Sequence, residues 1–157
     1  KSEIEHLESI ATSLDIALTE DDLVQIKEEL VEYGYIKRKR TDKKAKIKSK
    51  PFHYISSDGY HIYVGKNNYQ NEELTFKFAT GNDWWFHAKG MPGSHVIVKT
   101  NNETDLPDGR DSDKIEIDYL QKKNVKKPNG SAPGFVVYYT NFSLTVHPDI
   151  SDLTLVE

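Results

Sequence analysis

The spacing of the apolar residues changes once along this chain and divides it into a helical part and a β part. Before Gly34, apolar residues recur at intervals of three and four, the period of one face of an α-helix. After Pro51, apolar and polar residues alternate, the period of a half-buried strand. The residues at helical spacing are Leu7, Ile10, Leu14 and Ala17, followed by Leu23, Ile26, Leu30 and Tyr33. We therefore predict a helical segment over residues 2–33.

Two local signals mark helix ends within that segment. Thr19 is followed three residues later by Asp22, which resembles a capping box, although glutamate is the usual acid at this position. Gly34 stands where a glycine commonly ends a helix, because glycine adopts a positive φ without steric cost.

The rest of the chain predicts strands. Asp58-Gly59 between two alternating runs is the strongest short-range signal of a β-hairpin. The continuous apolar run from Phe135 to Tyr139 indicates a central strand covered on both faces. The predicted strands are 52–56, 60–64, 84–88, 94–99, 115–120, 134–140, 142–147 and 152–156. The fold class is α+β, with a helical appendage over 1–36, a basic linker or strand over 37–50 and a mainly antiparallel β domain with one or two short helices over 51–157.

Charge is unevenly distributed along the chain. The formal net charge is −4, which argues against a uniformly basic nucleic-acid-binding protein. Residues 1–36 hold ten acidic and two basic side chains, whereas residues 37–50 hold nine basic side chains and one acidic side chain. A second basic cluster consists of Lys122, Lys123, Lys126 and Lys127. One interpretation is that both blocks are solvated surface. The alternative is that they are two phosphate-binding patches, because a motif rich in aromatic residues lies between them.

Four consecutive aromatic residues, Trp84 to His87, form the centre of that motif. In a strand, Trp84 and Phe86 point to one face, and Trp85 and His87 point to the other. We predict that Phe86 is a core residue. We further predict that Trp85 and His87 are the more exposed pair, on which unpaired bases could stack.

Small and amide residues precede the aromatic strand. Gly65 is followed by Lys66-Asn67-Asn68, a combination that suits close approach to a phosphate or a base edge. The alternative is that both asparagines bond neighbouring backbone in a turn. Asn71, followed by two glutamates, predicts the start of a short helix. Leu74, Phe76 and Phe78 also fit the spacing of a strand, but we favour the helix.

Two histidines, His87 and His95, raise the question of metal binding or catalysis. Their separation of eight residues, without cysteine or an HExxH sequence, is a weak metal signal. No nucleophile motif, phosphate loop or dinucleotide fingerprint is present. We therefore expect no enzyme activity, metal or cofactor. The histidines are either hydrogen-bond donors lining an RNA groove or satisfied interior residues.

Most of residues 50–148 resembles the NFACT-R domain, the predicted RNA-binding module of NFACT proteins. The motifs in register are Asp58-Gly59-Tyr60, Tyr63-Val64-Gly65-Lys66-Asn67-Asn68, Asn71, Asn82-Asp83, Trp85-Phe86-His87-Ala88-Lys89, Pro92-Gly93-Ser94-His95-Val96, Asp118-Tyr119 and Lys122-Lys123-Asn124-Val125-Lys126-Lys127-Pro128. The helical segment resembles the end of the coiled coil that precedes this domain. Between the Pro92–Val98 and Asp118-Tyr119 segments, however, a longer helix of the family is absent, and we expect residues to be missing at Asp108–Gly109.

The resemblance implies an RNA-binding role without chemistry. Bacterial NFACT proteins of the RqcH, or fibronectin-binding protein A-like, kind act in ribosome-associated quality control. The implied partners are tRNA and the large ribosomal subunit, the implied activity is support of alanine tailing of stalled nascent chains, and the implied location is the cytoplasm. Carried over onto this sequence, the implied RNA-binding residues are Lys66, Asn67, Asn68, Trp85, His87, Lys89, Ser94, His95, Lys122, Lys123, Lys126 and Lys127.

The alternative function is that of an adhesin module, which would bind fibronectin or fibrinogen at the bacterial surface. The sequence has neither an apolar run of transmembrane length nor an export signal in favour of this role.

Overall fold

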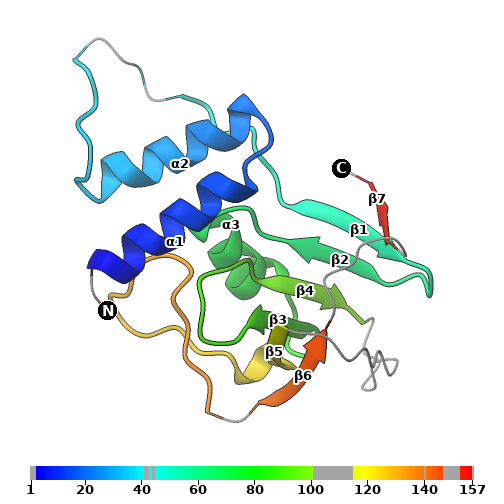
Figure 1. Cartoon of the computed structure of the whole chain (residues 1–157). Coiled ribbons are helices and arrows are strands. Elements are labelled where there is room, and N and C mark those ends of the chain that lie inside the picture. Colours follow the sequence, from blue (N-terminus) through cyan, green and yellow to red (C-terminus); the bar gives the residue numbers. More distant parts are fainter. Residues whose placement is uncertain are drawn as a thin grey trace.

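The N-terminal part of the protein is a hairpin of two helices. In the computed structural model, residues 3–40, 43, 45–100, 115–139, 141–146 and 153–156 are described. Helix α1 (Glu3–Ile16) and helix α2 (Glu20–Glu32) lie side by side at one edge of the molecule (Figure 1). The predicted helical segment is therefore confirmed. No helix among these described residues is long and apolar enough to cross a membrane.

The predicted helix ends are present. The Thr19 side chain accepts a hydrogen bond from the Asp22 backbone N–H at 3.3 Å, and the Asp22 carboxylate accepts one from the Thr19 N–H at 3.3 Å. Gly34 follows α2 with a φ of +79°. The buried face of the hairpin is more polar than its apolar spacing predicted, because Leu7, Leu14 and Leu23 are exposed. The buried positions of the two helices are His6, Ile10, Ser13, Asp22, Ile26 and Glu29.

The described strands form one seven-stranded antiparallel sheet in the order β6-β5-β3-β4-β2-β1-β7. The Asp58-Gly59 turn joins β1 and β2 as predicted, and Gly59 has a φ of +86°. The strands are β1 (Phe52–Ser56), β2 (His61–Val64), β3 (Trp84–Ala88), β4 (Val96–Lys99), β5 (Ile115–Gln121), β6 (Phe142–Val146) and β7 (Leu153–Leu155). The suspected gap at Asp108–Gly109 lies outside the described residues.

A short helix lies between the helical hairpin and the sheet (Figure 1). Helix α3 (Asn68–Glu73) continues directly into a π-helical turn, η1 (Leu74–Phe78). Its cap is Asn67, whose side-chain oxygen accepts from the Gln70 N–H at 3.0 Å, so the helix starts before the predicted Asn71. A 3-10 turn, η2 (Lys122–Asn124), follows β5.

The predicted strand over 134–140 is wrong. Among the described residues of this run, only Val137 pairs with another segment, through an isolated bridge to Lys126. Val136 and Tyr138 pack against the core instead. The run is apolar because its side chains cover the sheet, while its backbone takes part in no strand ladder.

One face of the sheet, here called the inner face, carries the core. Its buried cluster is Leu74, Ala79, Trp85, Ile97, Leu120 and Val125. Trp85 is fully buried, so the prediction that it is more exposed than Trp84 and Phe86 is wrong. Phe86, predicted to be a core residue, is only half-buried, and its ring stacks on Tyr119 outside the buried cluster. His87 is also half-buried. Strand alternation placed Trp85 and His87 on one face correctly, but α3, η1 and the 125–139 segment cover that face.

We expect Trp85→Ala to lower the free energy of unfolding by about 3–5 kcal/mol, because it empties a large volume at the centre of the core. The matched control is Tyr139→Ala, since Tyr139 is 91% exposed, and its effect should stay within about 0.5 kcal/mol. Denaturant unfolding of both variants measures the difference. Similar losses in the two variants would contradict this description of the core.

Candidate nucleic-acid interface

The Lys66-Asn67-Asn68 segment binds the helical hairpin. The Lys66 ammonium donates to an Asp22 carboxylate oxygen at 3.1 Å, and its side chain is only 14% exposed. The Asn67 amide donates to Gln25 at 2.8 Å. These contacts join the start of α3 to α2.

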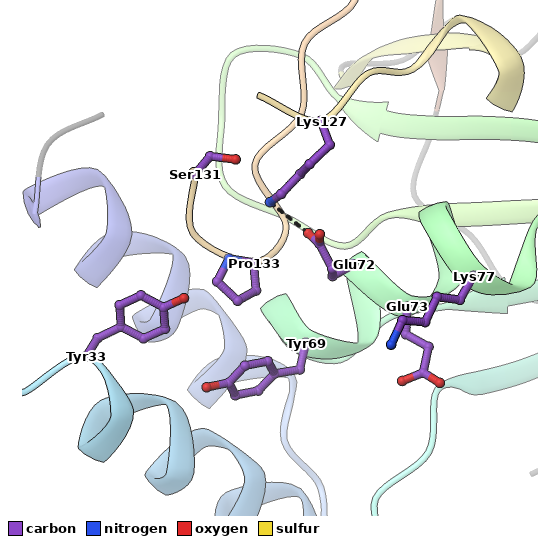
Figure 2. Close-up of a pocket in the computed structure, with 8 residues that line it drawn as sticks. All are labelled: Tyr33, Tyr69, Glu72, Glu73, Lys77, Lys127, Ser131 and Pro133. Carbon is purple, nitrogen blue, oxygen red and sulfur yellow. Dashed lines mark hydrogen bonds and ion pairs between the residues drawn. The ribbon is translucent and has the colours of Figure 1, made fainter. Parts of the chain in front are cut away.

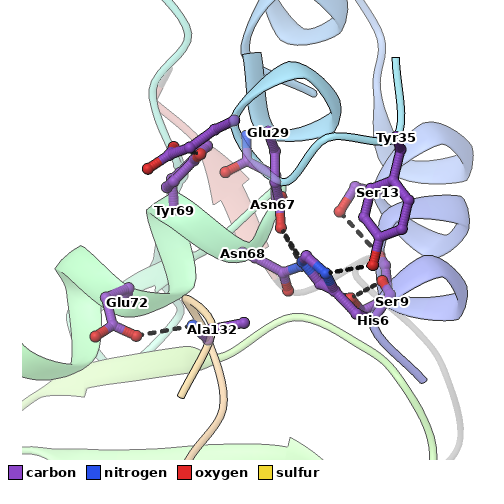
Figure 3. Close-up of polar contacts among 12 residues, drawn as sticks. His6, Ser9, Ser13, Glu29, Tyr35, Asn67, Asn68, Tyr69, Glu72 and Ala132 are labelled. Atoms are coloured by element: carbon purple, nitrogen blue, oxygen red, sulfur yellow. Dashed lines mark hydrogen bonds and ion pairs between the residues drawn. The ribbon is translucent and has the colours of Figure 1, made fainter. Parts of the chain in front are cut away.

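Asn68 lies at the centre of a buried polar network between the three helices (Figure 3). Its amide nitrogen donates to Glu29 at 2.9 Å and to Ser9 at 2.8 Å. The same Glu29 oxygen lies 2.8 Å from Nε2 of His6, whose Nδ1 lies 3.0 Å from the Tyr35 hydroxyl. Each of these residues is hydrogen-bonded to another member of the network, which offsets part of the cost of burying its polar groups.

These contacts change the interpretation of the glycine–lysine–asparagine motif. Asn67 and Asn68 are buried, and Lys66 is largely buried against Asp22. Their polar atoms face the hairpin and the cap of α3 in this structure. The motif therefore has a structural role that accounts for its residue types, and an RNA contact by these residues stays a prediction.

Asp22 is the most strongly bonded carboxylate in this interface. Burial alone would raise its pKa, but hydrogen bonds from Ser49, from the Leu18 N–H and from Lys66 outweigh burial and lower the pKa to about 2. The carboxylate is therefore ionised in the folded protein at every pH above this value.

Because the Asp22 pKa is lower in the folded chain than the ordinary value of 3.8, this carboxylate stabilises the fold above about pH 4. This contribution is lost as pH falls toward 2, and it is on the order of 2 kcal/mol at neutral pH. We expect Asp22→Asn to lower stability at pH 7 and to flatten the decline between pH 4 and 2. Unfolding measured across this range, with the exposed neighbour variant Asp21→Asn as control, checks this. An acid-induced decline as steep in Asp22→Asn as in Asp21→Asn would contradict it.

A cleft lined by polar and apolar side chains lies between α1 and the loop that joins β3 to β4. Its volume is about 400 Å³, and its lining includes Asn68, Asn71, His87 and His95. Asn71 accepts from the His95 backbone N–H at 3.0 Å. A Cβ on Gly65 would come within 1.9 Å of the Asn71 side-chain oxygen, so this approach requires glycine. The motif residues thus build the wall of this cleft.

The two histidines of the cleft differ in environment. His95 is buried, and its Nδ1 lies 2.9 Å from the Thr75 hydroxyl. Burial, together with nearby His87, lowers the pKa of His95 to about 3, so it is neutral near pH 7. His87 is half-buried, with Nδ1 3.3 Å from the Ser94 carbonyl. Ser94 is half-buried, and Lys89 is exposed in the same loop.

Within the described part of the chain, no group of three or more histidine, cysteine, aspartate or glutamate side chains is arranged to hold a metal ion. The rings of His87 and His95 are 5.5 Å apart and nearly perpendicular. Their nitrogens contact the Ser94 carbonyl and the Thr75 hydroxyl.

The lysine cluster of 122–127 is divided by the structure. Lys123 and Lys126 are exposed, and Lys122 is half-buried with its Nζ 5.9 Å from the centre of the Phe76 ring. Lys127 instead donates to Glu72 at 2.9 Å and to the Ala132 carbonyl at 2.6 Å. Three lysines are thus accessible, and two of them, Lys122 and Lys123, lie beside the segment that precedes β3. The fourth, Lys127, holds the 125–139 segment on α3.

Figure 2 shows the surroundings of Lys127. Its ion pair with Glu72 lies in a hollow of about 260 Å³, which is also lined by Tyr33, Tyr69 and Pro133. The Tyr69 hydroxyl donates to Glu32 at the end of α2. This hollow, like the polar network, lies where the hairpin meets α3.

Sequence reasoning missed two further lysines, Lys77 and Lys99. Lys77 is exposed in η1, and Lys99 ends β4 beside Asp83, at 2.6 Å. Each is a single lysine in its segment, so neither forms a run. The signal that could have found Lys99 is strand register, since β4 pairs with β3, which starts directly after Asp83.

Comparison with known proteins identifies similar sequences. Residues 50–121 match the family described as NFACT protein RNA binding domain. The chain is 42% identical to "Rqc2 homolog RqcH" of Streptococcus pneumoniae and 36% identical to the protein of the same name from Bacillus subtilis. In both cases 95% of this chain is aligned, and it spans 29% of the relative.

Two further similarities extend the comparison. Over 45% of this chain, the sequence is 30% identical to coiled-coil domain-containing protein 25 of Bos taurus, of which it covers 33%. The C-terminal structure of the fibronectin/fibrinogen-binding protein from Streptococcus suis has a TM-score of 0.81 and 40% identity. That alignment covers 93% of this chain and 64% of the other.

Proposed function

Since this chain carries an NFACT-R domain of the bacterial RqcH-like kind, we propose that it is an RNA-binding module of a ribosome quality control factor. Its contribution is contact with RNA and positioning of the attached helices, with no reaction of its own. The observation that carries this proposal is the coincidence of an RNA-binding domain match with the accessible lysines Lys122, Lys123 and Lys126.

The finer proposal concerns the RNA and the process. In line with the family resemblance, the partners are tRNA and the large ribosomal subunit, and the whole protein supports alanine tailing of stalled nascent chains in the cytoplasm. The name RqcH of the similar proteins supports this assignment. The fixed joint between the helical hairpin and the domain suits such a role, because RNA bound by the domain would also orient the hairpin.

The lysine cluster should determine the salt dependence of RNA binding. Each phosphate contact releases counterions, so log affinity falls linearly with log salt concentration. Replacing Lys122, Lys123 and Lys126 by alanine should reduce that slope by roughly one unit per lost contact. Titrating structured tRNA against the domain at several salt concentrations measures the slope.

Lys127→Ala provides the contrast within the same cluster. Because Lys127 is paired with Glu72, its loss should lower the stability of the domain and leave the salt slope unchanged. An unchanged slope in the triple variant would remove the three lysines from the interface. A reduced slope in Lys127→Ala would show that the fourth lysine also contacts RNA.

The second candidate is a fibronectin- or fibrinogen-binding adhesin module. It is favoured by the name of the structurally similar Streptococcus suis protein. Co-sedimentation of the domain with ribosomes, compared with its capture on immobilised fibronectin, separates the two functions.

A further inference from the structure

We propose that a row of rings and lysines on the inner sheet face binds unpaired RNA nucleotides. The row consists of His53, His61, Tyr63, Phe78, Lys99 and Lys122, with Lys123 beside it. This inference rests on the proposed RNA-binding function and assigns base contacts to residues other than Trp85. None of the six residues except Lys122 belongs to the RNA-binding residues implied by the family resemblance.

Strand register places the polar members of the row side by side. His61 on β2 is the direct partner of Lys99 on β4. Lys99 contacts Asp83 at 2.6 Å, and the Asp83 carbonyl accepts from the Lys122 backbone N–H at 2.9 Å. The row therefore crosses β2, β4, the residue before β3 and the end of β5. Three interstrand spacings give a span of about 14 Å, the length of about four stacked bases.

Aromatic rings continue from His61 toward the middle of the face, where Tyr63 pairs with Ile97. The His53 and Tyr63 rings are stacked, with centres 4.3 Å apart and an angle of 11°, and the His61 ring lies 5.0 Å from His53. Phe78 meets Tyr63 edge-on at 4.6 Å. Phe78 is 40% exposed, and His61 is also exposed. A base that stacks on these rings would extend the stack of rings that the protein already contains.

Two lysine ammonium groups lie over rings on this face. The Lys99 ammonium lies 4.9 Å from the Phe78 ring centre, and the Lys122 ammonium lies 5.9 Å from that of Phe76. Aromatic rings alternating with cations form the usual surface for single strands, because every base has a face that can stack and every nucleotide has a phosphate. Asp83 neutralises Lys99 and fixes its position, so the net positive charge comes from Lys122 and Lys123.

This geometry favours an unpaired strand over a duplex. In a duplex the base faces are already stacked on one another, and only the phosphates and groove edges remain for a protein. His53 and His61, whose nitrogens are 2.7 Å apart, are hydrogen-bonded to each other. Among the described residues they belong to no group of three or more side chains that could hold a metal ion.

The test compares two exposed phenylalanines on opposite faces of the sheet. Phe78 is 40% exposed on the inner face, and Phe142 is 58% exposed next to Tyr119 on the outer face. We expect Phe78→Leu to weaken binding of an unstructured oligouridine of about 12 nucleotides by roughly tenfold, because one stacked base contributes about 1–3 kcal/mol. Phe142→Leu should leave this affinity unchanged, and neither variant should alter binding of duplex RNA.

His61→Ala is a second variant, since His61 is exposed in β2 and its loss leaves the core intact. It should weaken oligouridine binding several-fold, as measured by fluorescence anisotropy. Wild-type affinity for oligouridine in both Phe78→Leu and His61→Ala would overturn this inference alone. Failure of the wild-type domain to bind either oligouridine or tRNA would overturn the proposed function itself.

Discussion

The polar joint between α3 and the helical hairpin is the interaction on which the rest of the structure depends. Helix α3 has only six residues before it becomes η1, too few to be stable alone. One side of it binds the hairpin through Asn67 and Asn68, and Leu74 at its end enters the core below. The short helix is stable because it packs between the hairpin and the core of the sheet. The hairpin is held in position because the side-chain amides of Asn67 and Asn68 bond to it.

The buried charges of this joint fix the orientation of the hairpin on the domain. Glu29 is fully buried and accepts a hydrogen bond from Asn68, while Lys66 faces the buried carboxylate of Asp22. A buried carboxylate without such partners would be strongly destabilising, so the hairpin has few alternative positions on the domain. Residues of the motif therefore fix the angle of the helices relative to the sheet. The accessible lysines of 122–126 lie outside this joint and remain free of its constraints.

Much of the fold follows from local patterns in the sequence. Period and turn chemistry predicted the helices, the capping box at Thr19, the hairpin at Asp58-Gly59 and most strands. The error at Trp85 has a different origin, because alternation groups side chains by face but does not say which face is covered. The prediction of a strand over 134–140 was wrong for a related reason, since an apolar segment can pack against a sheet as readily as form one of its strands. The sequence did not predict that Lys66-Asn67-Asn68 binds the hairpin, because amides that bind a helix and amides that bind RNA come from the same residue types.

The most direct measurement is amide hydrogen exchange of the domain with and without tRNA. We expect RNA to increase protection around residues 77–81 and 122–126. Residues 66–71, of which Lys66, Asn67 and Asn68 are hydrogen-bonded to the hairpin, should be equally protected with and without RNA. A gain of protection confined to residues 66–71, with none around the lysines, would contradict the assignment of this motif to the joint and of RNA binding to the lysine-bearing end of the sheet.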